Sequence, residues 1–355
     1  MNQNNQMVPT RRIYPLDHAD LSQEQLAVVF AMTSRRPEAF DAIAAEVGVE
    51  KAAQFHERWV LNYGHASVAE HAIVHMAVEN ISRLACDTLE DNRLASYTEK
   101  SSRYQILDSN AFFEPNELLD GKYLSMYRKT CQGLFDSYTR MVAEMMDSLP
   151  VVLPQADGES ENGYRLRLRR VAVDSCRFVL PASTLTNVGV TMNARSMEHA
   201  ITKLLSSDLQ EERSIGEELL VQGRMITPTL IKYADYNDYI HSVRDAQRVL
   251  DREHGDAVAP ELMHDNVTAT LYQYDLDAPR KLAIAILYRY STEAYGSIVD
   301  RVSLLDHESI QGVIDRYFEG LGPHDVPGRE LEVVEYVFEL VMDYGAYREF
   351  KRHRM

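Results

Sequence analysis

The chain has 355 residues, of which 45% are hydrophobic, so it is long enough for two domains with sizeable cores. Its formal net charge of -17 argues against non-specific binding to nucleic acid or to an anionic membrane, because both need surplus Lys and Arg. The first residues are polar and end in Arg11-Arg12 with no apolar segment behind them, which predicts neither a signal peptide nor a membrane span. We therefore expect a cytoplasmic protein in which a local basic pocket holds any anionic ligand.

The three cysteines, Cys86, Cys131 and Cys176, are odd in number and widely spaced. This pattern argues against a disulfide framework and against a zinc ribbon. Free cysteine is among the residue types most often buried, so we expect three reduced core residues.

The first part of the chain is predicted to be helical after a polar, disordered segment over residues 1–20. Residues 20–150 contain long runs without Pro and several windows with helical apolar spacing. Ser67-Val68-Ala69-Glu70 has the form of a capping box, and apolar or small residues follow at three- and four-residue steps as far as Thr88. The pattern predicts a helix of about six turns that delivers the chain to Asp91.

Composition changes along the rest of the chain divide it further. Pro, Gly and acidic residues predict an exposed excursion over 151–164, and polar composition predicts a connector over 241–278. Between them we expect a helix over 165–176 that ends at Pro181, a strand over 187–192, and helical structure over 193–222. A second helical region is expected from Pro279 to the C-terminal Arg352-His353-Arg354.

Four short motifs carry the functional information. They are Gly64-His65-Ala66-Ser67 with Glu70-His71, the segment from Asp91 to Tyr104, Arg177-Phe178-Val179-Leu180-Pro181, and Asn193-Ala194-Arg195. In their order and approximate spacing they resemble motifs of the flavin-dependent thymidylate synthases, whose signature reads R-H-R-x-x-S-x-N-E-x-S-x-R-Y. The resemblance covers roughly residues 25–235 and implies an α+β fold, rich in helices with a small β-sheet, of the thymidylate synthase-complementing type.

The resemblance also implies roles for individual residues. Substrate-binding residues would be Glu99, Ser101, Arg103 and Arg177. Cofactor-binding residues would be Ser67, Arg93, Glu99, Asn193, Arg195 and His199. The residue types suit this task, because the planar guanidinium of arginine matches phosphate and hydroxyl groups add neutral donors.

The sequence departs from the family pattern at several positions. Asp91 and Asn92 stand where the family has Arg and His, and Thr98 stands where it has Asn. The arginine that assists catalysis falls on Leu204, with Lys203 beside it, so the catalytic residue is unknown. A carboxylate such as Asp91 opposes a phosphate about 4 Å away by roughly 4 kcal/mol at an effective dielectric near 20.

An intact R-H-R occurs at Arg352-His353-Arg354. Placing it on residues 91–93 without gaps aligns 332–354 with 71–93, although only Ala85 with Ala346 and Arg93 with Arg354 are identical. We interpret residues 21–240 as one domain of this family and 279–355 as the truncated start of a second copy. Arg352, His353 and Arg354 would then supply cofactor-binding groups to a composite site between copies or subunits, and we expect a homo-oligomer.

The implied reaction is reductive methylation of dUMP to dTMP with FAD, NADPH and methylenetetrahydrofolate. The alternative is a catalytically inactive nucleotide- or flavin-binding scaffold of the same fold. A metal-dependent hydrolase built on His65, His71 and His75 is a poorer fit, because the acid of an H-E-x-x-H site is absent, and no metal is expected.

Overall fold

The computed structural model describes residues 12, 14, 16, 21–34, 36–62, 66–103, 106–107, 111–119, 121–254 and 269–353. The chain divides into two compact units, the first comprising Met1–Asp256 with Arg348–Met355 and the second Ala257–Tyr347. The predicted boundary at residue 240 falls inside a helix of the first unit. Most of the N-terminal segment 1–20 and part of the expected connector, residues 255–268, lie outside the described residues.

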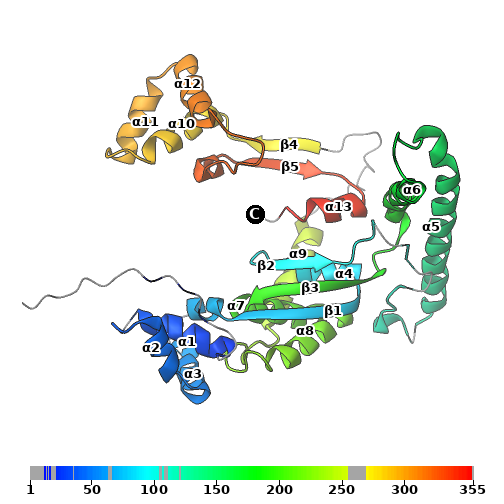
Figure 1. Cartoon of the computed structure of the whole chain (residues 1–355), viewed down its shortest axis with the longest axis horizontal. Helices are drawn as coiled ribbons and strands as arrows, with labels where there is room; N and C mark the ends of the chain where they lie inside the picture. The colour runs from blue at the N-terminus through cyan, green and yellow to red at the C-terminus, as the bar shows by residue number, and fades with distance from the viewer. Residues whose placement is uncertain are drawn as a thin grey trace, which may run out of the picture. The chain divides into compact units, whose positions relative to one another are not determined.

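The first unit is organised around a three-stranded antiparallel sheet with strand order β1-β3-β2 (Figure 1). The strands are β1 (Ile73–Ser82), β2 (Ala95–Glu99) and β3 (Leu185–Asn193). The predicted strand over 187–192 is confirmed as β3, and it is the central strand. In the register, Val190 lies opposite Met76 of β1 and Tyr97 of β2.

The predicted six-turn helix after Ser67 is wrong. A 3-10 helix, η2 (Ala66–His71), is followed by strand β1, and only the last two turns, α4 (Arg83–Glu90), are helical. The apolar residues of this stretch also satisfy strand alternation, since Val74 is buried, Met76 and Val78 are half-buried, and the residues between them are exposed. Pairing with β3 decides in favour of the strand, because it satisfies the backbone and places these side chains in the core.

Helices cover the sheet of the first unit and extend from it. A core of β1 and β3 residues packs against the helical residues Met197, Ile201, Leu204, Ile215 and Leu219. The helices of the unit are α1 (Gln23–Thr33), α2 (Phe40–Glu46), α3 (Val49–Phe55), α4, α5 (Leu124–Val152), α6 (Glu161–Cys176), α7 (Ala194–Leu205), α8 (Gln210–Gly223) and α9 (Asp238–His254). The short elements are a π-helical segment η1 (His56–Asn62), the 3-10 helices η2, η3 (Asn116–Leu118) and η4 (Arg177–Val179).

Helices α5 and α6 contact each other beside the sheet (Figure 1). Phe135 and Tyr138 of α5 are fully buried against Ala172 and Val173 of α6 in a core separate from that of the sheet. The helix predicted over 165–176 is confirmed as part of α6. The excursion predicted over 151–164 shrinks to the turn between Val152 and Glu161, because α6 begins four residues earlier than expected at a Ser160 side-chain cap.

The second unit contains a helical cluster and a two-stranded antiparallel ribbon. Ala283, Ile284, Ile298, Val302 and Ile310 form its core. Its elements are β4 (Ala269–Tyr274), α10 (Ala278–Tyr288), α11 (Tyr295–Ser303), α12 (His307–Phe318), the 3-10 helix η5 (Arg329–Val333), β5 (Tyr336–Leu340) and the beginning of α13 (Tyr344–Phe350), whose last residues belong to the first unit. The second helical region is therefore confirmed over α10, α11 and α12, but strand β5 interrupts it, and the expected connector contains most of α9 and all of β4.

The order of elements in α10 to α13 repeats the order in α1 to α4. Each series runs through three helices, a 3-10 helix, a strand and a helix, with the π-helical η1 additional in the first. With Arg352 placed on Asp91 and no gaps, Ser82 falls on Asp343. Ser82 accepts a hydrogen bond from the Ala85 amide at 3.0 Å, and Asp343 accepts one from the equivalent Ala346 amide at 3.0 Å. The two helices thus begin at equivalent residues with the same type of N-cap.

Two expectations concern the chain as a whole, namely the state of its cysteines and the length and polarity of its helices. Cys86, Cys131 and Cys176 are free and buried, as predicted. In the part of the chain that the structure describes, every helix is too short or too polar to cross a bilayer.

Candidate functional site

A cleft of about 670 Å³ lies at the start of α7 in the first unit. We call it the N-A-R cleft. Its lining residues are Glu70, Asp91, Asn92, Arg93, Leu94, Asn193, Arg195, Ser196, His199 and Lys203. The cleft therefore brings together four of the predicted cofactor-binding residues from segments about a hundred residues apart in the sequence: Arg93, Asn193, Arg195 and His199.

The helix α7 positions the cationic side of the cleft. Asn193 caps the helix by accepting a hydrogen bond from the Ser196 amide at 2.8 Å. Arg195, His199 and Lys203 follow at four-residue steps, which places them on one face of the helix. The positive end of the α7 dipole and these side chains together create a region suited to an anion.

Two carboxylates pair with the cations of the N-A-R cleft. Arg195 Nη1 lies 2.5 Å from Glu70 Oε1, and Lys203 Nζ lies 2.5 Å from Asp91 Oδ2. Burial pushes the pKa of Asp91 upward, but the hydrogen bond and charge of Lys203, with help from Lys351 and Arg93, bring that pKa below its ordinary value. Asp91 is thus held ionised, and Lys203 compensates for the acid that replaces the family's arginine.

The structure also separates Lys203 from Leu204. Leu204 is 1% exposed and packs in the core of the sheet, so the family's catalytic arginine position cannot reach the cleft here. Lys203 lines the cleft instead. Of the two residues that the sequence offered for this position, only Lys203 can contact a ligand.

A second group contains two predicted substrate-binding residues, Arg103 and Arg177. We call these two arginines with their acidic partners Asp174 and Glu349 the arginine clamp. The Arg103 guanidinium lies 3.3 Å from Asp174 and 3.0 Å from Glu349, and that of Arg177 lies 2.9 Å and 3.2 Å from the same two residues. Arg177 also donates to Ser102 Oγ at 3.2 Å. The positions where two arginines could hold a phosphate are therefore occupied by carboxylates of the same chain.

Glu99, predicted to bind both ligands, is instead the centre of a buried ion-pair network. Its side chain is 2% exposed, accepts from Thr186 Oγ1 at 2.8 Å, and accepts from Arg348 Nη2 with both carboxylate oxygens at 2.8 Å. Arg83 and Arg352 lie 3.5 and 3.3 Å away. Burial raises the pKa of Glu99, but the attraction of Arg348 and Arg83 outweighs burial, so this pKa is lowered.

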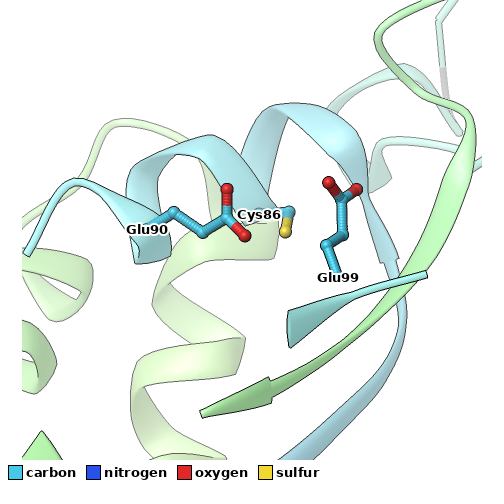
Figure 2. A group of neighbouring side chains, drawn as sticks. All are labelled: Cys86, Glu90 and Glu99. Carbon is cyan, nitrogen blue, oxygen red and sulfur yellow. The ribbon is translucent and has the colours of Figure 1, made fainter. Parts of the chain in front are cut away.

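Cys86, Glu90 and Glu99 could in principle hold a metal ion, since one ligand atom of each lies within 4.8 Å of the others. Figure 2 shows the three side chains gathered between α4 and β2. Burial strongly raises the pKa of the Cys86 thiol, so this group favours its protonated form, and burial also raises the pKa of Glu90. Metal ligation needs the deprotonated forms, and arginines already neutralise Glu99. The chemistry of the cluster therefore fits packing and ion pairing better than metal binding.

The remaining predicted residues that the structure describes are not among those that line the N-A-R cleft. Ser67 is exposed on η2, the same short helix that contributes Glu70, and Ser101 accepts a hydrogen bond from the Arg103 amide at 3.2 Å. Arg352 pairs with Glu99, and His353 is exposed. Gly64, His65, Tyr104 and Arg354 lie outside the described residues.

Of the histidines of the metal alternative, His71 and His75 are described by the structure, and they do not share a helix face. His71 stacks on Phe30 with ring centroids 4.8 Å apart, and His75 lies on strand β1, where its Nδ1 is 2.9 Å from Thr191 Oγ1. The helical four-residue spacing that suggested zinc depended on the helix that proved to be a strand.

Sequence reasoning missed the partners of the clamp and of Glu99. Asp174, Arg348 and Glu349 belong to none of the motifs, and Glu349 pairs with arginines more than 170 residues earlier in the chain. The available signal was the charge pattern at the end of the sequence, where Arg348, Lys351 and Arg352 lie close together.

Comparison with known proteins identifies a family that this chain resembles over more than half of its length. The sequence profile of the thymidylate synthase complementing protein family matches residues 16–229. A flavin-dependent thymidylate synthase of Clostridium tetani is 26% identical over 213 residues, which cover 59% of this chain and 82% of that protein.

Longer matches extend through most of the chain. UPF0159 proteins of Chlamydia pneumoniae and Chlamydia muridarum are 31% and 29% identical over 330 and 326 residues, or 88% and 87% of this chain. The chain spans 61% of the length of each. Among solved structures, the Helicobacter pylori ThyX complexed with FAD and dUMP covers 60% of this chain and 94% of its own, with 18% identity and a TM-score of 0.36.

Proposed function

The chain belongs to the thymidylate synthase complementing protein family, and on that premise we propose that it takes part in flavin-dependent methylation of dUMP to dTMP. The observation that carries the proposal is the N-A-R cleft, which gathers Arg93, Asn193, Arg195 and His199 at the N-terminus of α7. Arg93, Asn193 and Arg195 belong to motifs that resemble the family's flavin-contacting ones, and they lie together although the chain between residues 93 and 193 is long.

The donors of the cleft fit the anionic part of FAD. Arg195, Lys203 and the α7 dipole offer positive charge, and Ser196 and His199 offer further polar contacts. Glu70 and Asp91 neutralise part of that charge, so contacts with the uncharged parts of the cofactor would have to add to the electrostatic attraction. Bound flavin would supply the hydride for the reaction.

The protein's own residues would bind and orient the ligands. We propose that Arg195 and His199 hold the cofactor and that Lys203 stabilises negative charge that develops on the pyrimidine, in place of the arginine absent at Leu204. Ser67, from the same segment as Glu70, would complete the flavin contacts. NADPH and methylenetetrahydrofolate would act as hydride donor and carbon donor in a cytoplasmic reaction.

A composite site is part of the proposal. The clamp of the first copy is closed by Glu349, so the nucleotide would be held by groups from elsewhere, such as the R-H-R residues Arg352, His353 and Arg354 of another subunit in a homo-oligomer. The repeated order of elements in α1–α4 and α10–α13 supports residues 279–355 as the beginning of a second copy.

A spectroscopic and activity experiment tests the proposal. The purified chain is titrated with FAD while flavin fluorescence is followed, and dTMP formation is then assayed with dUMP, NADPH and methylenetetrahydrofolate. Arg195→Ala should weaken FAD binding at least about tenfold, since it removes a charge-assisted contact. The matched control is Arg140→Ala, which changes an exposed arginine of α5 and should leave binding unchanged.

The second candidate function is a non-catalytic flavin- or nucleotide-binding member of the family. The specific observation that favours it is the clamp, where Asp174 and Glu349 occupy both substrate arginines. FAD binding that depends on Arg195, without any dTMP formed, would select this candidate. Absence of FAD binding by the whole chain would reject both.

A further inference from the structure

Helices α4 and α13 occupy equivalent positions in the two repeated series and contact each other through their C-terminal turns. The residues concerned, 87–91 and 348–352, all belong to the first unit. With Arg352 placed on Asp91, Arg348 is equivalent to Asp87 and Lys351 to Glu90. At three equivalent positions, therefore, α4 is acidic and the C-terminal end of α13 is basic.

Equivalent residues meet at the centre of this contact. Arg348 Nε lies 3.2 Å from Asp87 Oδ1, and the two side chains are 8% and 9% exposed. A twofold or pseudo-twofold axis has this consequence, because a residue on the axis meets its own equivalent. The contact is thus arranged as two copies of one helix would pair.

The flanking residues meet in the reciprocal way. Lys351, the equivalent of Glu90, lies 4.0 Å from Asp91, and it also donates to the Asp87 carbonyl at 2.7 Å. Arg352, the equivalent of Asp91, lines the same 130 Å³ pocket as Glu90 and opposes the burial that raises the pKa of Glu90. Lys351 thus lies near Asp91, and Arg352 lies near Glu90. Position 90 of each copy therefore faces position 91 of the other copy.

From this arrangement we propose that the acidic face of α4, formed by Asp87, Glu90 and Asp91, is a pairing surface specific for a basic second-copy helix. In two identical copies, the same charge would stand at each position on both sides of the axis. Like charges in close contact repel, so an α4 helix rejects another α4 helix and accepts α13. Asp91 is then a determinant of which copies pair, rather than a damaged residue of the signature. The inference does not depend on catalysis.

The peripheral pair Asp91 and Lys351 provides the first test, because side chains 55% and 20% exposed tolerate substitution. Hydrogen–deuterium exchange of residues 344–353 in the full chain reports how often α13 detaches. Lys351→Glu should accelerate this exchange on the order of tenfold, since it places a third acid beside Asp87 and Asp91. Adding Asp91→Lys should recover about half of the change on a logarithmic scale, despite the nearby Lys203.

The buried pair Asp87 and Arg348 provides the second test. Asp87→Asn and Arg348→Gln, singly and together, form a double-mutant cycle with the same exchange measurement. If the two charges act as a pair, the double variant should exchange about as fast as the faster single variant. Circular dichroism of each variant shows whether the rest of the chain remains folded. If a buried variant unfolds, the exchange measurements on the peripheral pair Asp91 and Lys351 test the proposal instead.

Charge reversal elsewhere provides the control. Glu114→Lys breaks the Glu114–Arg128 pair, whose atoms are 2.6 Å apart near the start of α5, and should not change exchange at 344–353. The proposal is overturned if Asp91→Lys fails to slow the exchange of the Lys351→Glu variant, or if the effects of Asp87→Asn and Arg348→Gln simply multiply.

Discussion

The N-A-R cleft and the arginine clamp both derive from motifs that resemble phosphate-binding sequences, yet they differ in what stands beside the cations. In the cleft, Lys203 and Arg195 each pair with a partly exposed acid, and about 670 Å³ remains for a ligand. In the clamp, Asp174 and Glu349 contact both arginines. An arginine motif can therefore identify a family, whereas the availability of its arginines for a ligand depends on residues outside the motif.

The largest expected effect on stability comes from the buried ion pairs that Arg348 forms with Asp87 and Glu99. Arg348→Met leaves Asp87 and Glu99 without their main partner, and we expect a loss of about 3–5 kcal/mol in the free energy of unfolding of the first unit. Urea denaturation followed by circular dichroism measures it. Arg128→Met, at an exposed pair, should cost under about 1 kcal/mol; an equal loss in both variants would contradict the importance of the network.

Opening the clamp should create an anion site. Glu349→Gln removes the carboxylate that lies 3.0 and 3.2 Å from Arg103 and Arg177, so inorganic phosphate should bind at least about tenfold more tightly than to the unchanged chain. Isothermal titration calorimetry at low ionic strength measures the affinity. Glu144→Gln, at an exposed residue of α5, is the control, and equal phosphate affinity in all three proteins would show that Glu349 does not close the clamp.

The cleft should respond in opposite directions to its two central charges. Asp91→Asn removes an ionised acid and releases Lys203, so FAD affinity should rise roughly tenfold, whereas Lys203→Met should lower it by a similar factor. Quenching of flavin fluorescence measures both. The same direction of change in the two variants would be incompatible with an electrostatic role for this pair.

The smallest effect is expected at Glu90 and depends on pH. Burial raises the pKa of Glu90, so the folded state favours its neutral form, and ionisation costs stability as pH rises above the ordinary value of 4.5. Glu90→Gln should therefore raise the melting temperature by about 2 °C at neutral pH and leave it unchanged near pH 4. A thermal scan at both pH values measures this. A larger rise in melting temperature near pH 4 than at neutral pH would show that ionisation of Glu90 does not destabilise the folded state.

Parts of the fold were predictable because their signals are local. The strand β3 has a short β-prone run, α6 and α7 have helical spacing, and all three cysteines suit a reduced core, although the Ser160 cap of α6 lies inside the predicted excursion. The stretch from Ile73 to Ser82 was not predictable in this way, because its apolar residues fit a helix and a strand equally well. Only pairing with β3, more than a hundred residues later, distinguishes the two.

The family could be identified from four motifs in their order along the chain, and the family profile matches residues 16–229. Three residues that line the N-A-R cleft, Arg93, Asn193 and Arg195, come from those motifs, whereas His199 lies outside them. Tertiary structure decided which basic residues remain available to a ligand. Ion pairs such as Glu349 with Arg177 and Arg348 with Glu99 join residues far apart in the chain, and charge neutralisation at contact distance leaves no trace in local sequence.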